Sequence, residues 1–299
     1  MILKLGLFMR STTRHRSFNI HRHIVRQKNF STISSEEKNG DVLLVQERNS
    51  VVTLTLNRPK ERNALNYELL QKLHTELNDI GNAGKNVRAV VINSSGPMFC
   101  SGHDLKEIKS STIEDSRKVF ELCSEVMKML SLIPQPTISA VNGMATAAGC
   151  QLVASSDIAI GSESSVFMTP GVNIGLFCST PSIPLLEAIP KKIALDMLLT
   201  GRMLNAEEAI RYGLLSRIVP NEALQEEAQS LATIIASKSF QVIKSGKEII
   251  RKQESLRSWD DKYDDVATDA MVQGLLNEDS NIGLEAFLSK KEPKWEHKD

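Results

Sequence analysis

The sequence of 299 residues predicts an α/β fold with crossover connections, followed by a mainly helical C-terminal part. Two observations lead to this prediction. In the first two thirds, apolar strand patterns alternate repeatedly with amphipathic helix patterns. From Pro181 onward the pattern is almost entirely helical. We therefore expect an α/β core over residues 41–185. A helical C-terminal subdomain over residues 186–299 would pack its apolar stripes on the core or on a neighbouring subunit.

The first expected elements are two strands and a helix. Residues 42–46 (VLLVQ) and 51–56 (VVTLTL) are apolar and rich in β-branched side chains, and the second run ends at the turn NRP. Leucines then recur at helical spacing, with Asn63 or Asn66 as the N-cap and Gly81 beyond the end of the helix. This change of period predicts a strand pair followed by one amphipathic helix.

The middle of the chain continues the alternation. A strand is expected over residues 88–95 (RAVVINSS), and the loop GPMFCSGHDLKEI follows it. Asp104 in this loop is placed to cap a helix that starts at Leu105. A longer amphipathic helix over residues 113–132 is stopped by the sequence PQP. Short strands are then expected at TISAVNG, DIAIG and SVFMTPG.

The first 35 residues differ from the rest in composition. They contain seven Lys or Arg residues and several Ser and Thr, and no Asp or Glu precedes Glu36. This is typical of a mitochondrial presequence that is removed from the mature protein, although a disordered basic arm for nucleic acid has the same composition. The segment MILKLGLFMR is too short and too charged to span a membrane. We expect a matrix protein with its presequence in residues 1–35.

The rest of the chain is acidic, with 29 Lys and Arg against 36 Asp and Glu and a net charge of about −7. This balance argues against a nucleic-acid-binding surface. The four cysteines show neither C-x-x-C pairing nor zinc spacing, and we expect reduced, mostly buried thiols. No H-x-x-x-H motif or carboxylate cluster joins the remaining histidines, so no metal site is expected.

Two segments rich in small residues follow strands, FCSGHDL and MATAAGCQL. If a helix starts near Ala147, the amides of its first turn have no partner within the helix and point at whatever lies in front. Two amides from separate loops that converge on one oxygen can stabilise an oxyanion. Small residues also serve close helix packing, so each loop alone is a weak signal.

Five blocks together resemble the enoyl-CoA hydratase/isomerase (crotonase) family. They are VVTLTLNRPKERNALN, FCSGHDLKEI, TISAVNGMATAAGCQLVASSDIAI, FMTPGVNIGL and TGRMLNAEEAIRYGLLSRIVP, and the resemblance runs from about Val42 to the C-terminus. It implies a spiral of ββα units and a helical C-terminal trimerisation region, hence a homotrimer or a dimer of trimers. It also implies an acyl-CoA thioester as ligand, with coenzyme A as part of that ligand and no separate cofactor.

Carried onto this chain, the resemblance places the two oxyanion amides of the family on His103 and Ala148. The two hydratase glutamates of the family fall on Gln151 and Gly171. Hydration needs one group to activate water and another to handle the proton at the α-carbon. Gln151 has no accessible pKa and Gly171 has no side chain, so we expect two-carboxylate hydration to be absent or feeble.

Other residues are weaker candidates. The His103 side chain could act in catalysis or only fix its loop. Lys60 and Arg62 lie near where the family holds the phosphates of CoA, although a solvated surface loop explains them equally well. Asp157 matches a position that is usually structural in the family. Cys178 has no recognisable base partner, which favours a buried thiol over a nucleophile.

We therefore expect a mitochondrial acyl-CoA-binding protein of fatty acid or lipid metabolism that is not an efficient enoyl-CoA hydratase. Whether it is an enzyme stays open. One alternative is a CoA-thioester enzyme that needs only the oxyanion amides, such as a decarboxylase. Another is a weak enoyl-CoA hydratase in which Gln151 holds the water.

Overall fold

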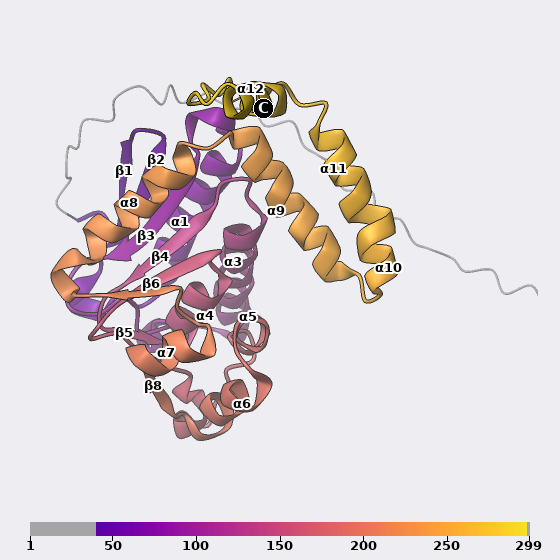
Figure 1. The fold of residues 1–299 in the computed structure, drawn as a ribbon. Helices are drawn as coiled ribbons and strands as arrows, with labels where there is room; N and C mark the ends of the chain where they lie inside the picture. Colours follow the sequence, from indigo (N-terminus) through magenta and orange to yellow (C-terminus); the bar gives the residue numbers. More distant parts are fainter. Residues whose placement is uncertain (1–39, 298–299) are drawn as a thin grey trace, which may run out of the picture. The chain divides into compact units, whose positions relative to one another are not determined.

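The computed structural model describes residues 40–297, so the expected presequence in residues 1–35 lies outside the described part. Figure 1 shows the order of the elements. The strands are β1 (Leu43–Arg48), β2 (Val51–Leu56), β3 (Ala89–Ser94), β4 (Thr137–Val141), β5 (Met144–Thr146), β6 (Ile158–Ser162), β7 (Val166–Met168), β8 (Met203–Asn205) and β9 (Arg217–Val219).

The α-helices have these bounds: α1 (Tyr67–Gly81), α2 (Leu105–Ser110), α3 (Ile113–Leu132), α4 (Ala148–Ser155), α5 (Ser182–Ala188), α6 (Lys191–Thr200), α7 (Ala206–Tyr212), α8 (Leu224–Ala236), α9 (Phe240–Ser255), α10 (Trp259–Lys262), α11 (Thr268–Gly274) and α12 (Glu278–Leu288). A π-helical turn, Tyr263–Ala267, joins α10 to α11. Short 3-10 turns include Pro59–Glu61 and Pro170–Ile174.

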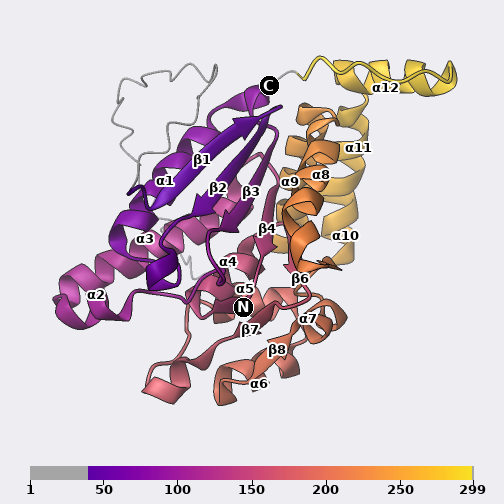
Figure 2. The same ribbon diagram turned by 90° about the vertical axis from the view of Figure 1, so that its left-hand side faces the viewer.

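The main sheet has the strand order β1-β2-β3-β4-β6-β9. Its first pair is antiparallel, and every later pair is parallel. Figure 2 shows α1 and α3 on one face and α8 on the other. The side chains of β2, β3 and β4 accordingly divide between two buried apolar clusters, the smaller of which includes α8. Burial on both faces explains why these strands are continuous apolar runs in the sequence.

Several helix boundaries agree with the sequence. Asn66, one of the two candidates, is the N-cap of α1, and its side chain accepts a hydrogen bond from the Leu69 amide at 3.0 Å. Asp104 caps α2, which starts at Leu105, and α3 covers the expected residues 113–132. Gly81 differs from the expectation, because it is the last residue of α1 rather than the first beyond it.

The final third is less purely helical than the sequence indicates. Strand β9 pairs parallel with β6 and extends the main sheet, while β8 pairs antiparallel with β7 in a second sheet of order β5-β7-β8. Each has three residues, too few to display an alternating pattern. Residues 40–297 belong to one compact unit, and the division into core and subdomain at residue 185 stays a prediction.

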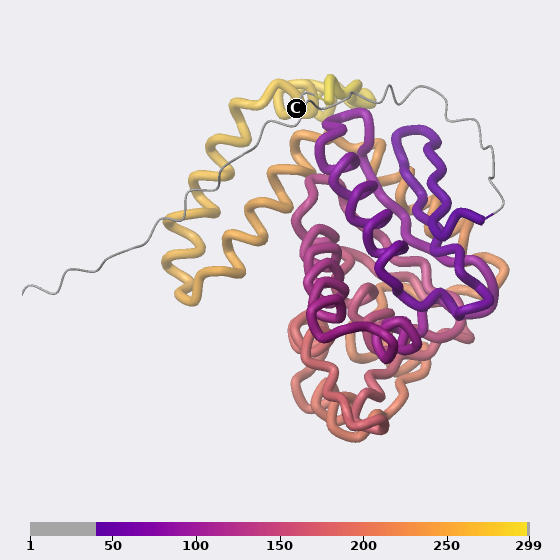
Figure 3. Tube along the Cα trace, turned by 180° about the vertical axis from the view of Figure 1, so that it is seen from behind, coloured from indigo at the N-terminus to yellow at the C-terminus, as the bar shows by residue number. Residues whose placement is uncertain are grey.

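The last helices form a separate layer of the described chain. Figures 1 and 3 show α9 beside α10 and α11, which return antiparallel to it. Within residues 40–297, no helix has the length and apolar character needed to cross a membrane.

Candidate functional site

The two loops rich in small residues are in direct contact. The Cys100 amide donates to the Met144 carbonyl at 3.1 Å, and the Thr146 amide donates to the Cys100 carbonyl at 2.8 Å. This short parallel bridge brings the loop after β3 against the turn from β5 into α4. Gly149 permits the contact, since a Cβ atom there would stand 2.4 Å from the Cys100 carbonyl oxygen.

The His103 and Ala148 amides lie on these facing loops. Gly102 has φ +88°, and a Cβ atom on it would stand 3.4 Å from the Ala148 nitrogen, so the segment that leads into His103 touches the start of α4. Within residues 40–297, neither the His103 amide nor the Ala148 amide donates a hydrogen bond to a protein acceptor. Ala148 is the first residue of α4, where backbone amides have no partner inside the helix. Two unpaired donors therefore belong to this site.

Ala147 holds the turn before α4 in a strained conformation. Its φ is 50° and its ψ −112°, a region that residues with a side chain rarely adopt. The Ala147 amide donates to the Met168 carbonyl at 2.9 Å, which ties the turn to β7. Such strain costs of order 1–3 kcal/mol and persists only where the surroundings impose it. Here the hydrogen bond to Met168 is one of the contacts that impose it.

The His103 side chain packs against α3. Its ring meets the Phe120 ring edge to face, with 4.8 Å between centroids and an interplanar angle of 82°. Burial lowers the pKa of His103 to about 4, although a hydrogen bond with the Leu65 backbone acts in the opposite direction. Its Nδ1 atom is buried and has no hydrogen-bond partner among the described residues. The imidazole is therefore neutral near pH 7 and a weak base.

Arg58 is a residue of this site that the sequence did not single out. Its Nη2 lies 3.1 Å from Oδ2 of Asp104, and both side chains are largely buried. Burial acts to raise the pKa of Asp104, but the hydrogen bond and charge of Arg58, with the Glu107 and Lys106 amides, lower it below its ordinary value. This ion pair fixes the loop that carries His103. The partners are 46 residues apart, so no local pattern links them.

Lys60 and Arg62 are exposed on the turn around Pro59–Glu61. The Arg62 carbonyl accepts a hydrogen bond from the Ser101 amide at 3.1 Å, and the Leu65 amide donates to the Gly102 carbonyl at 2.8 Å. The backbone of this turn is thus attached to the loop of His103. The structure brings both cationic residues to the edge of the site with their side chains in solvent.

Gln151 is 4% exposed and lies one turn after Ala148 in α4. Its Oε1 atom is buried without a hydrogen-bond partner within residues 40–297, as are Oγ1 of Thr146 and Oγ1 of Thr169. Buried polar atoms without partners are rare and each calls for an explanation, such as a ligand or a water. The sequence offered no sign of the two threonines.

Gly171 lies in the turn Pro170–Ile174 and has no space for a side chain. A Cβ atom there would stand 2.6 Å from the Leu176 carbonyl oxygen and 2.9 Å from Sγ of Cys178. The Leu176 amide also donates to the Gly171 carbonyl at 2.9 Å. The loop of residues 171–178 therefore folds back on itself and leaves no room for a side chain at residue 171.

The four cysteines are free and buried, as expected. Burial raises the pKa of Cys178, against an opposing hydrogen bond from the Gly171 backbone, and it raises the pKa of Cys150 to about 12. A thiol with a raised pKa is a poor nucleophile. Within the described part of the chain, no three His, Cys, Asp or Glu side chains gather as metal ligands would.

A cavity of about 850 Å³ opens next to Gln151. Its walls come from α3, α4, α5 and α9, and they include Met127, Ala154, Ile183, Val242 and Ile250. This size is within the range of small-molecule sites. No local feature of the sequence indicated that α9 would complete its wall.

Comparisons with known proteins agree with this architecture. The family model for enoyl-CoA hydratase/isomerase matches residues 46–298. The mitochondrial enoyl-CoA hydratase domain-containing protein 3 of Rattus norvegicus is 44% identical over 253 residues, which cover 84% of this chain and 83% of that protein. The enoyl-CoA hydratase domain-containing protein 3 of Danio rerio is 43% identical, over a match that covers 87% of this chain and 89% of that protein.

Solved structures show the same fold. The crystal structure of human enoyl-CoA hydratase domain-containing protein 3 superposes with a TM-score of 0.82 at 42% identity. The superposition covers 85% of this chain and 100% of the human chain. An enoyl-CoA hydratase of Mycobacterium smegmatis gives 0.81 at 37% identity, covering 85% and 99%. The chain has the crotonase fold, and it belongs to the enoyl-CoA hydratase/isomerase family.

Proposed function

We propose that this protein binds acyl-CoA thioesters in the mitochondrial matrix, as part of fatty acid or lipid metabolism, and is not an efficient enoyl-CoA hydratase. The observation that carries the proposal is the pair of unpaired amides of His103 and Ala148, together with the lack of a carboxylate at Gln151 and Gly171. The thioester carbonyl oxygen would lie between the two amides. The CoA phosphates would lie near Lys60 and Arg62.

The electrostatics favour an enolate at this place. Each preorganised donor aimed at a developing oxyanion contributes roughly 3 kcal/mol to stabilisation in a dry site. Ala148 adds the positive end of the α4 dipole. Enolate stabilisation thus needs nothing beyond the backbone that is present.

Proton transfer lacks an equivalent group. Gln151 offers only an amide, and Gly171 is closed against Leu176 and Cys178. Because burial lowers the pKa of His103 to about 4, its imidazole is a weak base at neutral pH. These features support binding without efficient hydration. The unpaired Oε1 of Gln151 can still hold a water, which would leave a feeble hydratase.

A second candidate function uses only the oxyanion amides. In a malonyl-type thioester, the bond between the α-carbon and the carboxylate breaks, CO₂ leaves and the electron pair moves onto the thioester oxygen. The enolate then takes a proton from water. No general base is required, which fits the residues present.

The basic composition of residues 1–35 and the mitochondrial relatives support the location. Large apolar side chains exposed on the C-terminal helices and on the turn between α11 and α12 support a homotrimer or a dimer of trimers. They include Trp259, Met271, Leu276, Phe287 and Leu288, each at least 73% exposed. Large apolar side chains exposed in this number on neighbouring elements are typical of an interface.

Titration calorimetry with butyryl-CoA tests the binding. Ala148→Pro removes one amide donor at the start of α4 and also disturbs the turn at Ala147, whose ψ of −112° is outside the range favoured before proline, and it should weaken binding by at least about tenfold, or ~1.4 kcal/mol. Ile113→Pro makes the same change at the start of α3 and should leave affinity unchanged. No measurable affinity of the wild type for any acyl-CoA would overturn the proposal. Mass spectrometry on a panel of CoA thioesters, including malonyl types, separates a binder from an enzyme, since only an enzyme gives products.

A further inference from the structure

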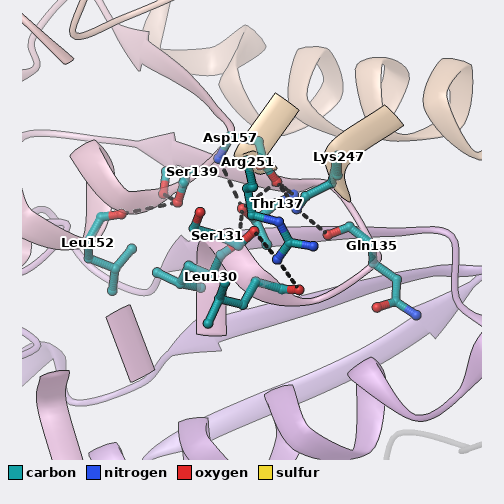
Figure 4. Close-up of polar contacts among 11 residues, drawn as sticks. Leu130, Ser131, Gln135, Thr137, Ser139, Leu152, Asp157, Lys247 and Arg251 are labelled. Atoms are coloured by element: carbon teal, nitrogen blue, oxygen red, sulfur yellow. Dashed lines mark hydrogen bonds and ion pairs between the residues drawn. The ribbon is translucent and has the colours of Figure 1, made fainter. Parts of the chain in front are cut away.

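Helix α9 is attached to the core mainly through long polar side chains. Of its residues only Phe240, at its start, is buried. Further along, Lys247 Nζ donates to Asp157 Oδ2 at 2.6 Å and to the Gln135 carbonyl at 3.1 Å. One turn later, Arg251 Nη1 donates to the Leu132 carbonyl at the end of α3 at 2.7 Å. Figure 4 shows these side chains reaching from α9 across to the core.

Hydrogen bonds from Thr137 fix the orientation of the Asp157 carboxylate. Its Oδ2 accepts hydrogen bonds from the Thr137 amide at 2.7 Å and from Thr137 Oγ1 at 3.0 Å. The Lys247 side chain is 11% exposed and the Asp157 side chain 27%. The pair is thus partly buried, and loss of one partner would leave the other charge without its nearest compensation. We therefore expect both residues to contribute to the position of α9.

The cavity of about 850 Å³ lies between α9 and the core. Val242 and Ile250 of α9 line it, yet they are 47% and 55% exposed, so this apolar face of α9 lacks a covering. Gly246 lines it too, and a Cβ atom there would have nothing within 4 Å. An apolar ligand in the cavity would cover the face of α9.

Helix α4 connects this cavity to the thioester site. Ala148, Gln151 and Ser155 are spaced by three and four residues, hence on one side of α4, and the latter two line the cavity. From Ala148 to Ser155 the axis advances about 10 Å at ~1.5 Å per residue. With C–C bonds of ~1.5 Å, a butyryl group falls well short of Ser155, whereas a dodecanoyl chain extends past it. Gln151, with its unpaired Oε1, lies between the thioester site and the rest of the cavity.

We propose that the Lys247 and Asp157 pair determines the acyl-chain length that this protein selects, by holding α9 as the wall of an acyl-chain chamber. The ligands so selected are medium- and long-chain acyl thioesters. This inference rests on the proposed thioester site. Lys247 and Asp157 act as positioning residues, since they hold α9 rather than touch the thioester.

Calorimetry on the full chain with butyryl-CoA and dodecanoyl-CoA tests the inference. The wild type should prefer dodecanoyl-CoA. Lys247→Met should lower that preference about tenfold with little change for butyryl-CoA, while Lys247→Arg, which keeps the pair, restores it. Lys252→Met is the matched control, because Lys252 is exposed on α9 and outside the cavity, and it should change neither affinity.

A second pair of variants leaves the ion pair intact. Gly246→Leu fills the chamber and suits a helix interior, so it should abolish the preference for dodecanoyl-CoA while butyryl-CoA still binds. Gly274→Leu on α11 makes the same change in open space away from the cavity and should have no effect.

Equal affinity of the wild type for both chain lengths would overturn the inference but not the thioester site. So would a Gly246→Leu variant that changes the oligomeric state on size-exclusion chromatography with light scattering and keeps the preference, because a second copy would then cover α9. Failure of the wild type to bind either ligand would overturn the proposed function itself.

Discussion

Gly149 lies directly against Cys100: a Cβ atom on Gly149 would stand 2.4 Å from the carbonyl oxygen of Cys100 and 2.8 Å from its Cβ atom. This contact sets the distance between the loop that carries His103 and the helix that starts at Ala148. Two backbone amides from separate loops can converge on one ligand atom only if the loops lie close together. The absence of a side chain at residue 149 is thus part of the site.

Gly149→Ala should separate the two loops. We expect the free energy of unfolding to fall by about 1–3 kcal/mol, as for other overpacked positions, and butyryl-CoA affinity to fall as well. Urea denaturation and calorimetry measure the two effects. Gly274→Ala, where nothing lies within 4 Å of the added atom, is the control and should not lower stability. Unchanged affinity in Gly149→Ala would show that the spacing of the loops does not matter for binding.

Ala147→Gly should stabilise the protein. Glycine adopts φ 50° without the strain that alanine has there, which outweighs its greater loss of backbone entropy, and we expect a gain of about 1 kcal/mol. The same substitution within α4, Ala154→Gly, should instead cost about 1 kcal/mol. Denaturation curves for both variants provide the comparison. A loss of stability in Ala147→Gly would mean that the turn is not strained.

Restoring carboxylates at residues 151 and 171 tests the hypothesis that the protein lacks the two proton-transfer groups of a hydratase. Gln151→Glu alone should leave crotonyl-CoA hydration near the wild-type rate, because one of the two proton-transfer groups is still missing. The double variant Gln151→Glu with Gly171→Glu should raise the rate by about 10² or more. It should also be less stable, since Leu176 and Cys178 must move to admit a side chain. Hydration is measured from the loss of the absorbance of the enoyl thioester. Rapid hydration by the wild type would refute the hypothesis that these groups are missing.

His103 should make the fold sensitive to acid. Its folded pKa of about 4 lies below the ordinary 6.5, so between these values the unfolded chain binds more protons and stability falls as the pH drops. The loss between pH 7 and pH 4 is at most about 3 kcal/mol, at 1.36 kcal/mol per pKa unit. His103→Gln should flatten this part of the stability curve in urea denaturation. His74→Gln, which changes a side chain that is 37% exposed, should retain it.

Local features of the sequence decided most of the helix and strand boundaries. Asp104 caps α2 because a carboxylate can reach the next amides of its own chain, and α3 follows from apolar spacing ended by PQP. The side-chain chemistry at Gln151 and Gly171, an amide and a hydrogen atom, is likewise set by the sequence alone. The presence of buried free cysteines followed from spacing and composition.

Other features depended on packing between distant segments. The short strands β8 and β9 exist because β7 and β6 offer them partners, and three residues are too few to reveal this locally. Arg58 meets Asp104 across 46 residues, and Lys247 meets Asp157 across 90. The closed space around Gly171 and the cavity beside Gln151 arise from the same long-range contacts. The sequence determined which groups are available, and only the tertiary structure decided which of them meet, since close approach depends on how whole elements pack.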